Sequence, residues 1–278
     1  MGDAVRTGPH KTPAWLRSGD DITILPGRSE LPPLRRSAEA ILQAMDNVDT
    51  FSSIFHREVS WLRGRVSDQP GRRFNFLIGG DHSQSLRLLT HMPDAVLVWD
   101  AHLDFRTNLH PHAQVLRKLA EAGKDIAIWG ARAYSEEEWA RAQKMGALVV
   151  RAHDPLEPLL DWIQRHRRIY LSVDVDVFPW DSLYPEAGGV LWQDCVRILK
   201  ALDGRIAGAD IVEALPSAAY RVAGLAIHII AANIPNPKAN LRAHPQLNGD
   251  EKPAEKKAHI STKVGQHPKA RRPSPHEN

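Results

Sequence analysis

The 278-residue sequence contains a single cysteine, Cys195. This excludes an internal disulfide framework and any zinc site built on two or more cysteines, and it fits a reducing compartment, so we expect a cytoplasmic protein. No apolar run reaches the roughly 18 residues of a membrane span, and the N-terminus lacks the apolar core of a signal peptide. No internal repeat is visible. Because 42% of the residues are apolar, the chain can still bury a sizeable core.

The formal net charge of +3 comes from the C-terminal end of the chain. Residues 235–278 hold nine of the 36 Lys and Arg residues, four of the 33 Asp and Glu residues and seven prolines, so they carry +5 and the rest of the chain −2. A segment this poor in apolar residues cannot offset its ordering entropy. We therefore expect a disordered basic tail at 235–278 and a flexible N-terminus at 1–20. Neither nucleic acid nor a membrane is expected as a partner.

Short apolar runs of the kind found in buried parallel strands alternate with amphipathic patterns typical of helices. The runs predict strands at 22–25, 74–78, 95–99, 125–130, 147–150, 168–173 and 206–212. Helices are predicted at 34–48, 51–65, 84–91, 113–122, 135–145, 156–166, 192–203 and 219–233. This alternation indicates one α/β domain over residues 21–234, with a parallel sheet between layers of helices.

Polar residues that are suited to metal binding follow several of the apolar runs. The sequence GGDHS (79–83) follows the second run, DAHLD (100–104) the third, DVD (174–176) the sixth, and Glu213 the last. Side chains at i, i+2 and i+4 of an extended segment share one face. Asp100, His102 and Asp104 therefore converge, as do Asp174 and Asp176. The carboxyl ends of parallel strands are where sites form in open α/β sheets.

Carboxylates placed so close together repel one another unless a cation lies between them. Each motif alone also fits a structural role, since capped glycine turns and alternating Asp residues on exposed strands are common. Together, at the ends of buried strands, they favour a site for a pair of divalent cations. Carboxylate and imidazole ligands without thiolate favour Mn²⁺, with Ni²⁺ or Co²⁺ as alternatives.

These motifs resemble those of the ureohydrolase superfamily, the relatives of arginase and agmatinase. The similarity covers about residues 70–234 and extends to NLHPHAQVLRKL (108–119), GARAYSEEEW (130–139), PEAGG (185–189) and ADIVEALP (209–216). The resemblance implies a three-layer α/β fold around a parallel sheet of about eight strands, and two Mn²⁺ ions per chain. It also implies a small guanidino substrate and a homo-oligomer, trimeric or hexameric.

The resemblance also implies a role for each matching residue. It assigns His82 and Asp104 to one metal, His102 and Asp176 to the other, and Asp100 and Asp174 to both as bridges. His112 would be a proton donor or shuttle, and Glu213 would hydrogen-bond the guanidinium. Asp81 is expected to cap its turn rather than to bind a metal.

The implied activity is hydrolysis of an agmatine-like guanidino compound to urea and an amine, by a hydroxide that bridges the two metals, in polyamine metabolism. Alternatives are another guanidino, formimino or amide substrate, or a non-catalytic metal-binding interaction protein. The loop 177–184 is shorter than in the family, which makes the substrate harder to assign. Arg106, where arginases have an asparagine, and Trp180, in the shortened loop, are the candidate substrate-binding residues, although Trp180 fits core packing equally well.

Overall fold

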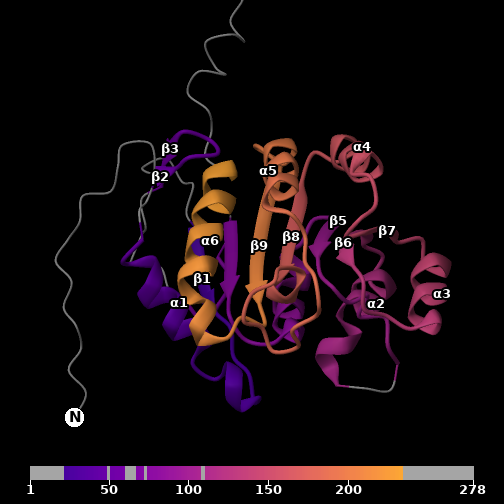
Figure 1. Cartoon of the computed structure of the whole chain (residues 1–278), viewed down its shortest axis with the longest axis horizontal. Helices are drawn as coiled ribbons and strands as arrows, with labels where there is room; N and C mark the ends of the chain where they lie inside the picture. Colours follow the sequence, from indigo (N-terminus) through magenta and orange to yellow (C-terminus); the bar gives the residue numbers. More distant parts are fainter. Residues whose placement is uncertain (1–21, 49–50, 60–66, 72–73, 108–109, 234–278) are drawn as a thin grey trace, which may run out of the picture. The chain divides into compact units, whose positions relative to one another are not determined.

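A computed structural model describes residues 22–48, 51–59, 67–71, 74–107 and 110–233. Its centre is a parallel sheet with the strand order β1-β4-β9-β8-β5-β6-β7 (Figure 1). The strands are β1 (Ile22–Pro26), β4 (Phe74–Ile78), β5 (Ala95–Trp99), β6 (Asp125–Ala131), β7 (Leu148–Arg151), β8 (Ile169–Asp174) and β9 (Ile206–Val212). The α/β class and the parallel sheet predicted from the sequence are confirmed, with seven strands in the described residues rather than about eight.

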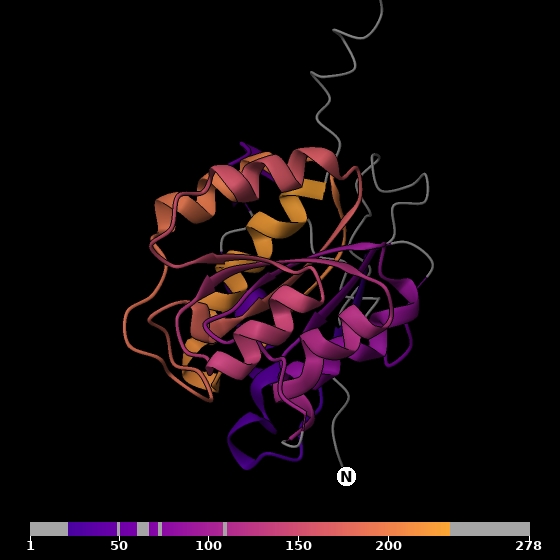
Figure 2. The ribbon, with the colours of Figure 1, turned by 90° about the vertical axis from the view of Figure 1, so that its right-hand side faces the viewer.

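Helices cover both faces of the sheet, which lies between two helical layers in Figure 2. One face packs against α1 (Ser37–Met45), α4 (Glu157–Arg165), α5 (Trp192–Ala201) and α6 (Ala219–Asn233). The other packs against η4 (His82–His91), α2 (Val115–Glu121) and α3 (Glu136–Lys144). The sheet is therefore the middle of three layers.

The alternation of side chains along each strand divides the core between the two layers. In β5, Leu97 and Trp99 belong to the cluster under α4 to α6, whereas Val96 and Val98 belong to the cluster under α2 and η4. Both faces of the strand are buried, so the whole run is apolar. This is why each strand could be predicted from a continuous apolar run.

The predicted helix at 51–65 is wrong over the residues that the structure describes. Phe51–Ser52 (β2) pairs antiparallel with Arg57–Glu58 (β3) instead, and residues 60–66 lie outside the described chain. His56 between them has φ = 51°, which belongs to a turn and not to a helix. The Ser52 hydroxyl lies 2.9 Å from His228 Nδ1, and Arg57 donates to the Ala231 carbonyl, so contacts with α6 hold this hairpin.

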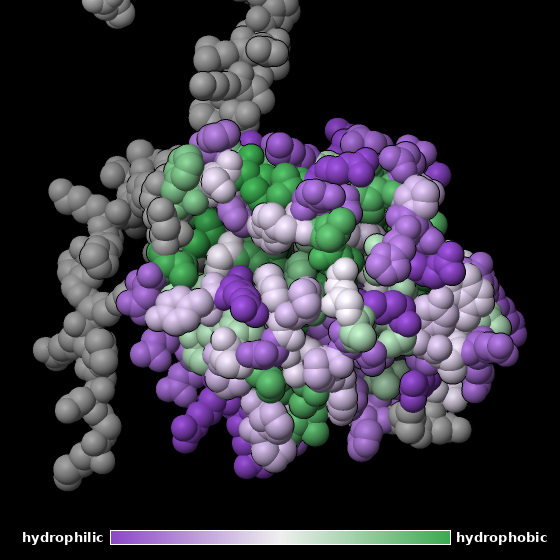
Figure 3. Space-filling model, viewed as in Figure 1, coloured by the Kyte–Doolittle hydropathy of each residue, from purple (hydrophilic) through white to green (hydrophobic). Residues whose placement is uncertain are grey.

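Few large apolar side chains are exposed on the described part of the domain. Phe51, Tyr184, Leu191, Trp192 and Tyr220 are the exposed ones, and in Figure 3 apolar residues alternate with hydrophilic ones over the visible face. No helix among the described residues is long and apolar enough to cross a membrane. The segments predicted to be a flexible N-terminus and a disordered tail, 1–20 and 235–278, lie outside the described residues.

Gly27 allows the ends of β1 and β4 to come together, and we expect it to tolerate no side chain. A Cβ built there lies 1.7 Å from the Gly79 carbonyl oxygen. Gly27→Ala should lower the free energy of unfolding by about 1–3 kcal/mol, the usual cost of forcing apart a well-packed region. Chemical denaturation of the purified variant measures this change.

Gly224→Ala in α6 is the matched control, because a Cβ at this glycine has no neighbour within 4 Å. It should raise the free energy of unfolding by about 0.5–1 kcal/mol, since alanine is the better helix former. Equal stability of the two variants would contradict the proposed close approach.

Candidate metal centre

The candidate metal ligands and Glu213 lie at the carboxyl ends of four neighbouring strands. In sheet order these strands are β4, β9, β8 and β5. His82, Glu213 and Asp100 follow β4, β9 and β5, and Asp174 is the last residue of β8. The chain passes from β5 to β6 on one side, whereas it passes from the neighbouring β8 to β9 on the other side, so the connections diverge between β5 and β8. Such a switch point is where α/β sheets form their sites.

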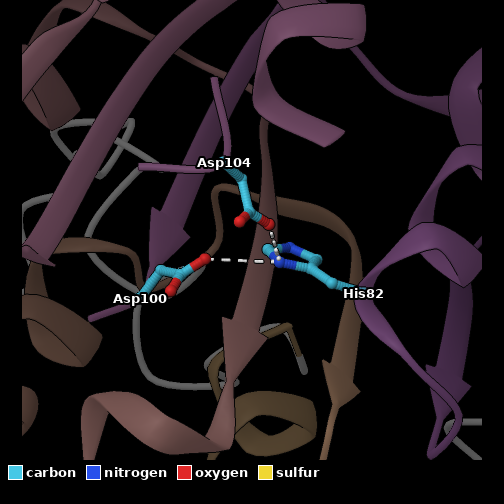
Figure 4. A group of neighbouring side chains, drawn as sticks. All are labelled: His82, Asp100 and Asp104. Atoms are coloured by element: carbon cyan, nitrogen blue, oxygen red, sulfur yellow. Dashed lines mark ion pairs between the residues drawn. The ribbon is translucent and has the colours of Figure 1, made fainter. Parts of the chain in front are cut away.

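A first group of possible ligands is formed by His82, Asp100 and Asp104 (Figure 4). His82 Nδ1 lies 2.9 Å from Asp104 Oδ2 and 3.3 Å from Asp100 Oδ2. All three residues are buried. The imidazole edge and the two carboxylates thus face one point, although they come from opposite ends of a stretch of more than twenty residues.

A second group is formed by Asp100, His102 and Asp176. His102 Nδ1 lies 2.7 Å from Asp176 Oδ2 and 3.7 Å from Asp100 Oδ1. Asp100 belongs to both groups and turns one oxygen toward each histidine, as a bridging carboxylate would. Asp174 Oδ2 lies 3.5 Å from His82 Nδ1, beside the first group. The structure therefore brings together all six residues for which a ligand role was predicted.

Three buried atoms of these groups have no hydrogen-bond partner: His82 Nδ1, Asp100 Oδ2 and Asp176 Oδ2. The contacts of His82 Nδ1 with the carboxylates of Asp104 and Asp100 are close in distance but are not hydrogen bonds. A buried polar atom without a partner is costly. Divalent cations would satisfy these atoms, and the imidazole and carboxylate donors suit them chemically. The residues present therefore fit a two-metal site.

Without cations the cluster must hold protons. Burial, together with the charges of Asp176 and Asp104, raises the pKa of Asp100 to about 7. Burial and the charges of Asp176 and Glu213 raise the pKa of Asp174 well above its ordinary value. Burial acts to lower the pKa of His102, but its contacts with Asp176 and Asp100 outweigh this effect and raise the pKa to about 10. Cations that bind here would therefore have to displace protons from Asp100, Asp174 and His102.

Two of the site residues have left-handed backbone conformations. Asp104 has φ = 51° and Glu213 has φ = 60°, which costs a non-glycine residue of order 1 kcal/mol. Hydrogen bonds hold Glu213 in place: its backbone N–H donates to the Gly80 carbonyl, and its Oε1 accepts from the backbone N–H of His82 at 3.1 Å. Burial, opposed by His82, raises the pKa of the Glu213 carboxyl to about 8. Asp81 caps the same turn by accepting from the Ser83 backbone N–H, as expected.

A cavity of about 240 Å³ opens onto the cluster. Its lining residues are His102, Asp104, Arg106, His110, His112, Ala113, Glu138, Asp174, Tyr184 and Glu213. His112 is stacked between the rings of His110 and Tyr184, each with its centroid 5.5 Å away. Burial lowers the pKa of His112. His112, Glu213 and Arg106 therefore all border the space beside the candidate ligands.

The two residues predicted to bind substrate lie in different places. Arg106 lines the cavity, with its Nε 3.2 Å from the Glu138 carboxylate. Trp180 stacks on Phe178 with ring centroids 4.1 Å apart and packs against the core cluster. It is not among the residues that line this cavity. Tyr184, four positions further along the same loop, reaches the cavity instead.

The loop between β8 and α5 is fastened by Arg132, which follows β6. Its guanidinium donates to the carbonyls of Asp176, Val177 and Ala187 at 2.6, 3.3 and 3.0 Å. This loop carries Glu186, whose Oε1 lies 3.3 Å from His102 Nε2. Arg132 thereby holds both ends of the loop close to the second ligand group. Arg132 belongs to the motif GARAYSEEEW, but its hydrogen bonds to this loop were not predicted from the sequence.

The carboxylate of Asp210, which is buried beneath η4, was also not predicted to have a role. Asp210 in β9 is fully buried and accepts hydrogen bonds from the hydroxyls of Tyr170 and Ser172 in β8. The available signal was the alternation of Tyr170, Ser172 and Asp174, which places a polar stripe on the face that ends in a candidate ligand. The partner strand could not be identified without the sheet order.

We expect metal binding to displace protons from this cluster. In the metal-free protein the carboxyl of Asp100 has a pKa of about 7 and the imidazole of His102 one of about 10, so both are at least partly protonated at pH 7. Metal ligands must lose these protons. The affinity for Mn²⁺ should therefore rise between pH 6 and pH 8, with net proton release. Calorimetric titration in two buffers of different ionisation enthalpy measures both quantities.

A variant outside the site, His166→Gln, should release as many protons as the unmodified chain. Proton uptake on binding, or an affinity that is the same at pH 6 and pH 8, would contradict the expectation.

Comparisons with known proteins identify the family and the fold of this chain. Residues 21–234 match the model of the arginase family. An N(1)-aminopropylagmatine ureohydrolase of Thermococcus kodakarensis is 35% identical over 150 residues, which are 49% of this chain and 52% of the relative. An agmatinase of Pyrococcus horikoshii is 32% identical over 155 residues, covering 51% and 55% of the two chains. These matches thus span about half the length of the curated relatives.

Solved structures of low sequence identity share the fold. The agmatine ureohydrolase of Thermoplasma volcanium superposes with a TM-score of 0.66 at 18% identity, over 81% of this chain and 92% of that one. The arginase of Medicago truncatula gives 0.61 at 20% identity, over 78% and 89%. With a family match that covers most of the chain and the candidate ligands gathered at one edge of the sheet, this protein belongs to the arginase family.

Proposed function

We propose that this chain is a hydrolase that uses two divalent cations to cleave a C–N bond of a small guanidino compound, giving urea and an amine. The observation that carries the proposal is the pair of ligand groups that share Asp100 beside a cavity lined by Glu213 and His112. The family and the names of its relatives support the same reaction class. Residues 21–234 would form the catalytic unit.

Six residues would hold the two ions. His82 and Asp104 would bind one, His102 and Asp176 the other, and Asp100 and Asp174 would bridge them. Bound there, the ions would lower the pKa of a water molecule enough to supply a nucleophile near neutral pH. The donor set favours Mn²⁺, with Ni²⁺ or Co²⁺ as alternatives.

Glu213 is suited to orient a guanidinium. Its carboxylate is buried, it lines the cavity, and one of its oxygens is held by the His82 backbone N–H. In the metal-free protein burial raises its pKa to about 8. A positively charged substrate would favour its ionised form, so the pair would form as substrate enters. The planar carbon of the guanidinium would then face the two ligand groups.

His112 is suited to pass a proton to the leaving amine. Its ring borders the cavity and is held by stacking on His110 and Tyr184. Because burial lowers its pKa, the ring is mainly neutral at pH 7, with one nitrogen protonated and one free. In that state it can relay a proton from solvent as the C–N bond breaks. Water adds to the guanidinium carbon, and the nitrogen of the amine leaves with that proton.

An agmatine-like substrate is the first candidate, in line with the names of the relatives. A carboxylate-bearing guanidino compound is the second, because Arg106 presents a half-exposed guanidinium to the cavity. Glu138 already pairs with the Nε of that group, which leaves its outer nitrogens for a substrate carboxylate.

Urea release over a set of substrates tests the proposal. With Mn²⁺ present, at least one of agmatine, arginine, 4-guanidinobutyrate and guanidine should yield urea. Agmatine should be preferred if the cavity accepts a cationic ammonium group at the far end of the substrate. The acid 4-guanidinobutyrate should be preferred if Arg106 pairs with a substrate carboxylate. In the second case Arg106→Gln should raise KM for 4-guanidinobutyrate more than for agmatine. No urea from any of them would favour a formimino or amide substrate, or a non-catalytic metal-binding protein.

Asp100→Asn and Asp174→Asn should each abolish turnover. Each change removes a bridging charge, and the ions contribute several kcal/mol to the stabilisation of the transition state, so we expect a loss of roughly 10³-fold or more in kcat. Metal content is measured on the same samples. Full activity of either variant with unchanged metal content would refute the ligand assignment, and Asp161→Asn on the exposed side of α4 serves as the control for expression and folding.

A further inference from the structure

A buried polar chain leads from the interior of the sheet to one of the candidate metal ligands. Asp210 and Ser172 are register partners on the neighbouring strands β9 and β8. The Ser172 hydroxyl donates to Asp210 Oδ1 at 2.6 Å. On its other side, Ser172 Oγ lies 3.3 Å from His82 Nε2. All three residues are buried, with Asp210 completely inaccessible.

The direction of these hydrogen bonds determines which nitrogen of His82 carries a proton. A hydroxyl has one proton, and that of Ser172 is given to Asp210. Ser172 Oγ can therefore only accept from His82, which places the proton of the neutral ring on Nε2. The other nitrogen, Nδ1, keeps its lone pair, and it is this atom that faces Asp100 and Asp104.

We propose that Asp210, acting through Ser172, is a positioning residue that orients His82 and holds it in the tautomer that presents Nδ1 to a metal ion. The inference rests on the proposed two-metal centre and deepens it. Outer partners of this kind fix the orientation of a metal-bound histidine and increase its basicity. It also accounts for an ionisable group within a sheet that has no direct contact with the cavity.

The fold offers a matched control. Tyr170, two residues before Ser172 on the same face of β8, also donates to Asp210, at 2.8 Å to Oδ2. Tyr170→Phe removes one hydrogen bond from the buried Asp210 carboxylate, as Ser172→Ala does. Unlike Ser172, however, Tyr170 does not lie between Asp210 and His82. A purely structural role for Asp210 predicts similar effects of Tyr170→Phe and Ser172→Ala. A role in orienting His82 predicts that they differ.

The experiment measures Mn²⁺ binding to the metal-free full-length chain by calorimetry, together with thermal stability. We expect the unmodified chain to bind two ions. Ser172→Ala and Asp210→Asn should weaken one of them by about 10–100-fold and leave the other nearly unchanged. Tyr170→Phe should lower stability while keeping both affinities within about 3-fold. Electron paramagnetic resonance should show the coupled signal of two Mn²⁺ ions in the unmodified chain and in Tyr170→Phe, and a single-ion signal in Ser172→Ala at limiting metal.

Two outcomes would overturn the inference, and they differ from failure of the metal centre itself. Two ions bound equally well by Ser172→Ala and by the unmodified chain would assign Asp210 to stability alone. Nitrogen-15 NMR of the Zn²⁺-loaded unmodified chain, with the His82 signals assigned from His82→Gln, tests the tautomer even if a variant does not fold. A proton on Nδ1 of His82 would reject the proposal. Failure of the unmodified chain to bind any ion would refute the two-metal centre instead.

Discussion

Electrostatic repulsion within one buried edge of the sheet is the constraint on which the rest of this structure depends. Asp100, Asp104, Asp174, Asp176 and Glu213 lie there with very little access to water. Two histidines offset part of this negative charge, and burial still raises the pKa values of Asp100, Asp174 and Glu213. Such an arrangement is expensive unless cations complete it. The two residue groups that share Asp100 therefore fit a pair of divalent cations.

The surrounding structure keeps the ligands from moving apart. Gly79 and Gly80 turn the chain sharply from β4 to His82, and Glu213 connects β9 back to that turn through two hydrogen bonds. Arg132 fastens the loop after β8 through hydrogen bonds to backbone carbonyls. These interactions use backbone groups, which tolerate variation in neighbouring side chains.

Much of the fold could be predicted because the required information lies within short segments. All seven strands of the large sheet were predicted to within two residues at each end, since their runs are mainly apolar and most of their residues are buried. The segment 51–58 shows where this reasoning fails. Its apolar spacing suits a helix, but Ser52 and Arg57 contact residues of α6 that lie 176 and 174 positions later in the chain. Tertiary contacts overrode a weak local preference there.

The sequence by itself determined which residues could converge within a motif. The motifs DAHLD and DVD place carboxylates and imidazole directly after buried strands, although residues 101–102 bend and Val175–Val177 forms a 3-10 helix instead of continuing the strand. Only the tertiary structure decided which motifs meet. The pairing of β8 with β9 sets Ser172 against Asp210, and the path of the loop brings Glu186 to His102 and Tyr184, rather than Trp180, to the cavity. The physical reason is that side-chain periodicity is a local property of the backbone, whereas sheet order and loop path depend on how distant segments pack.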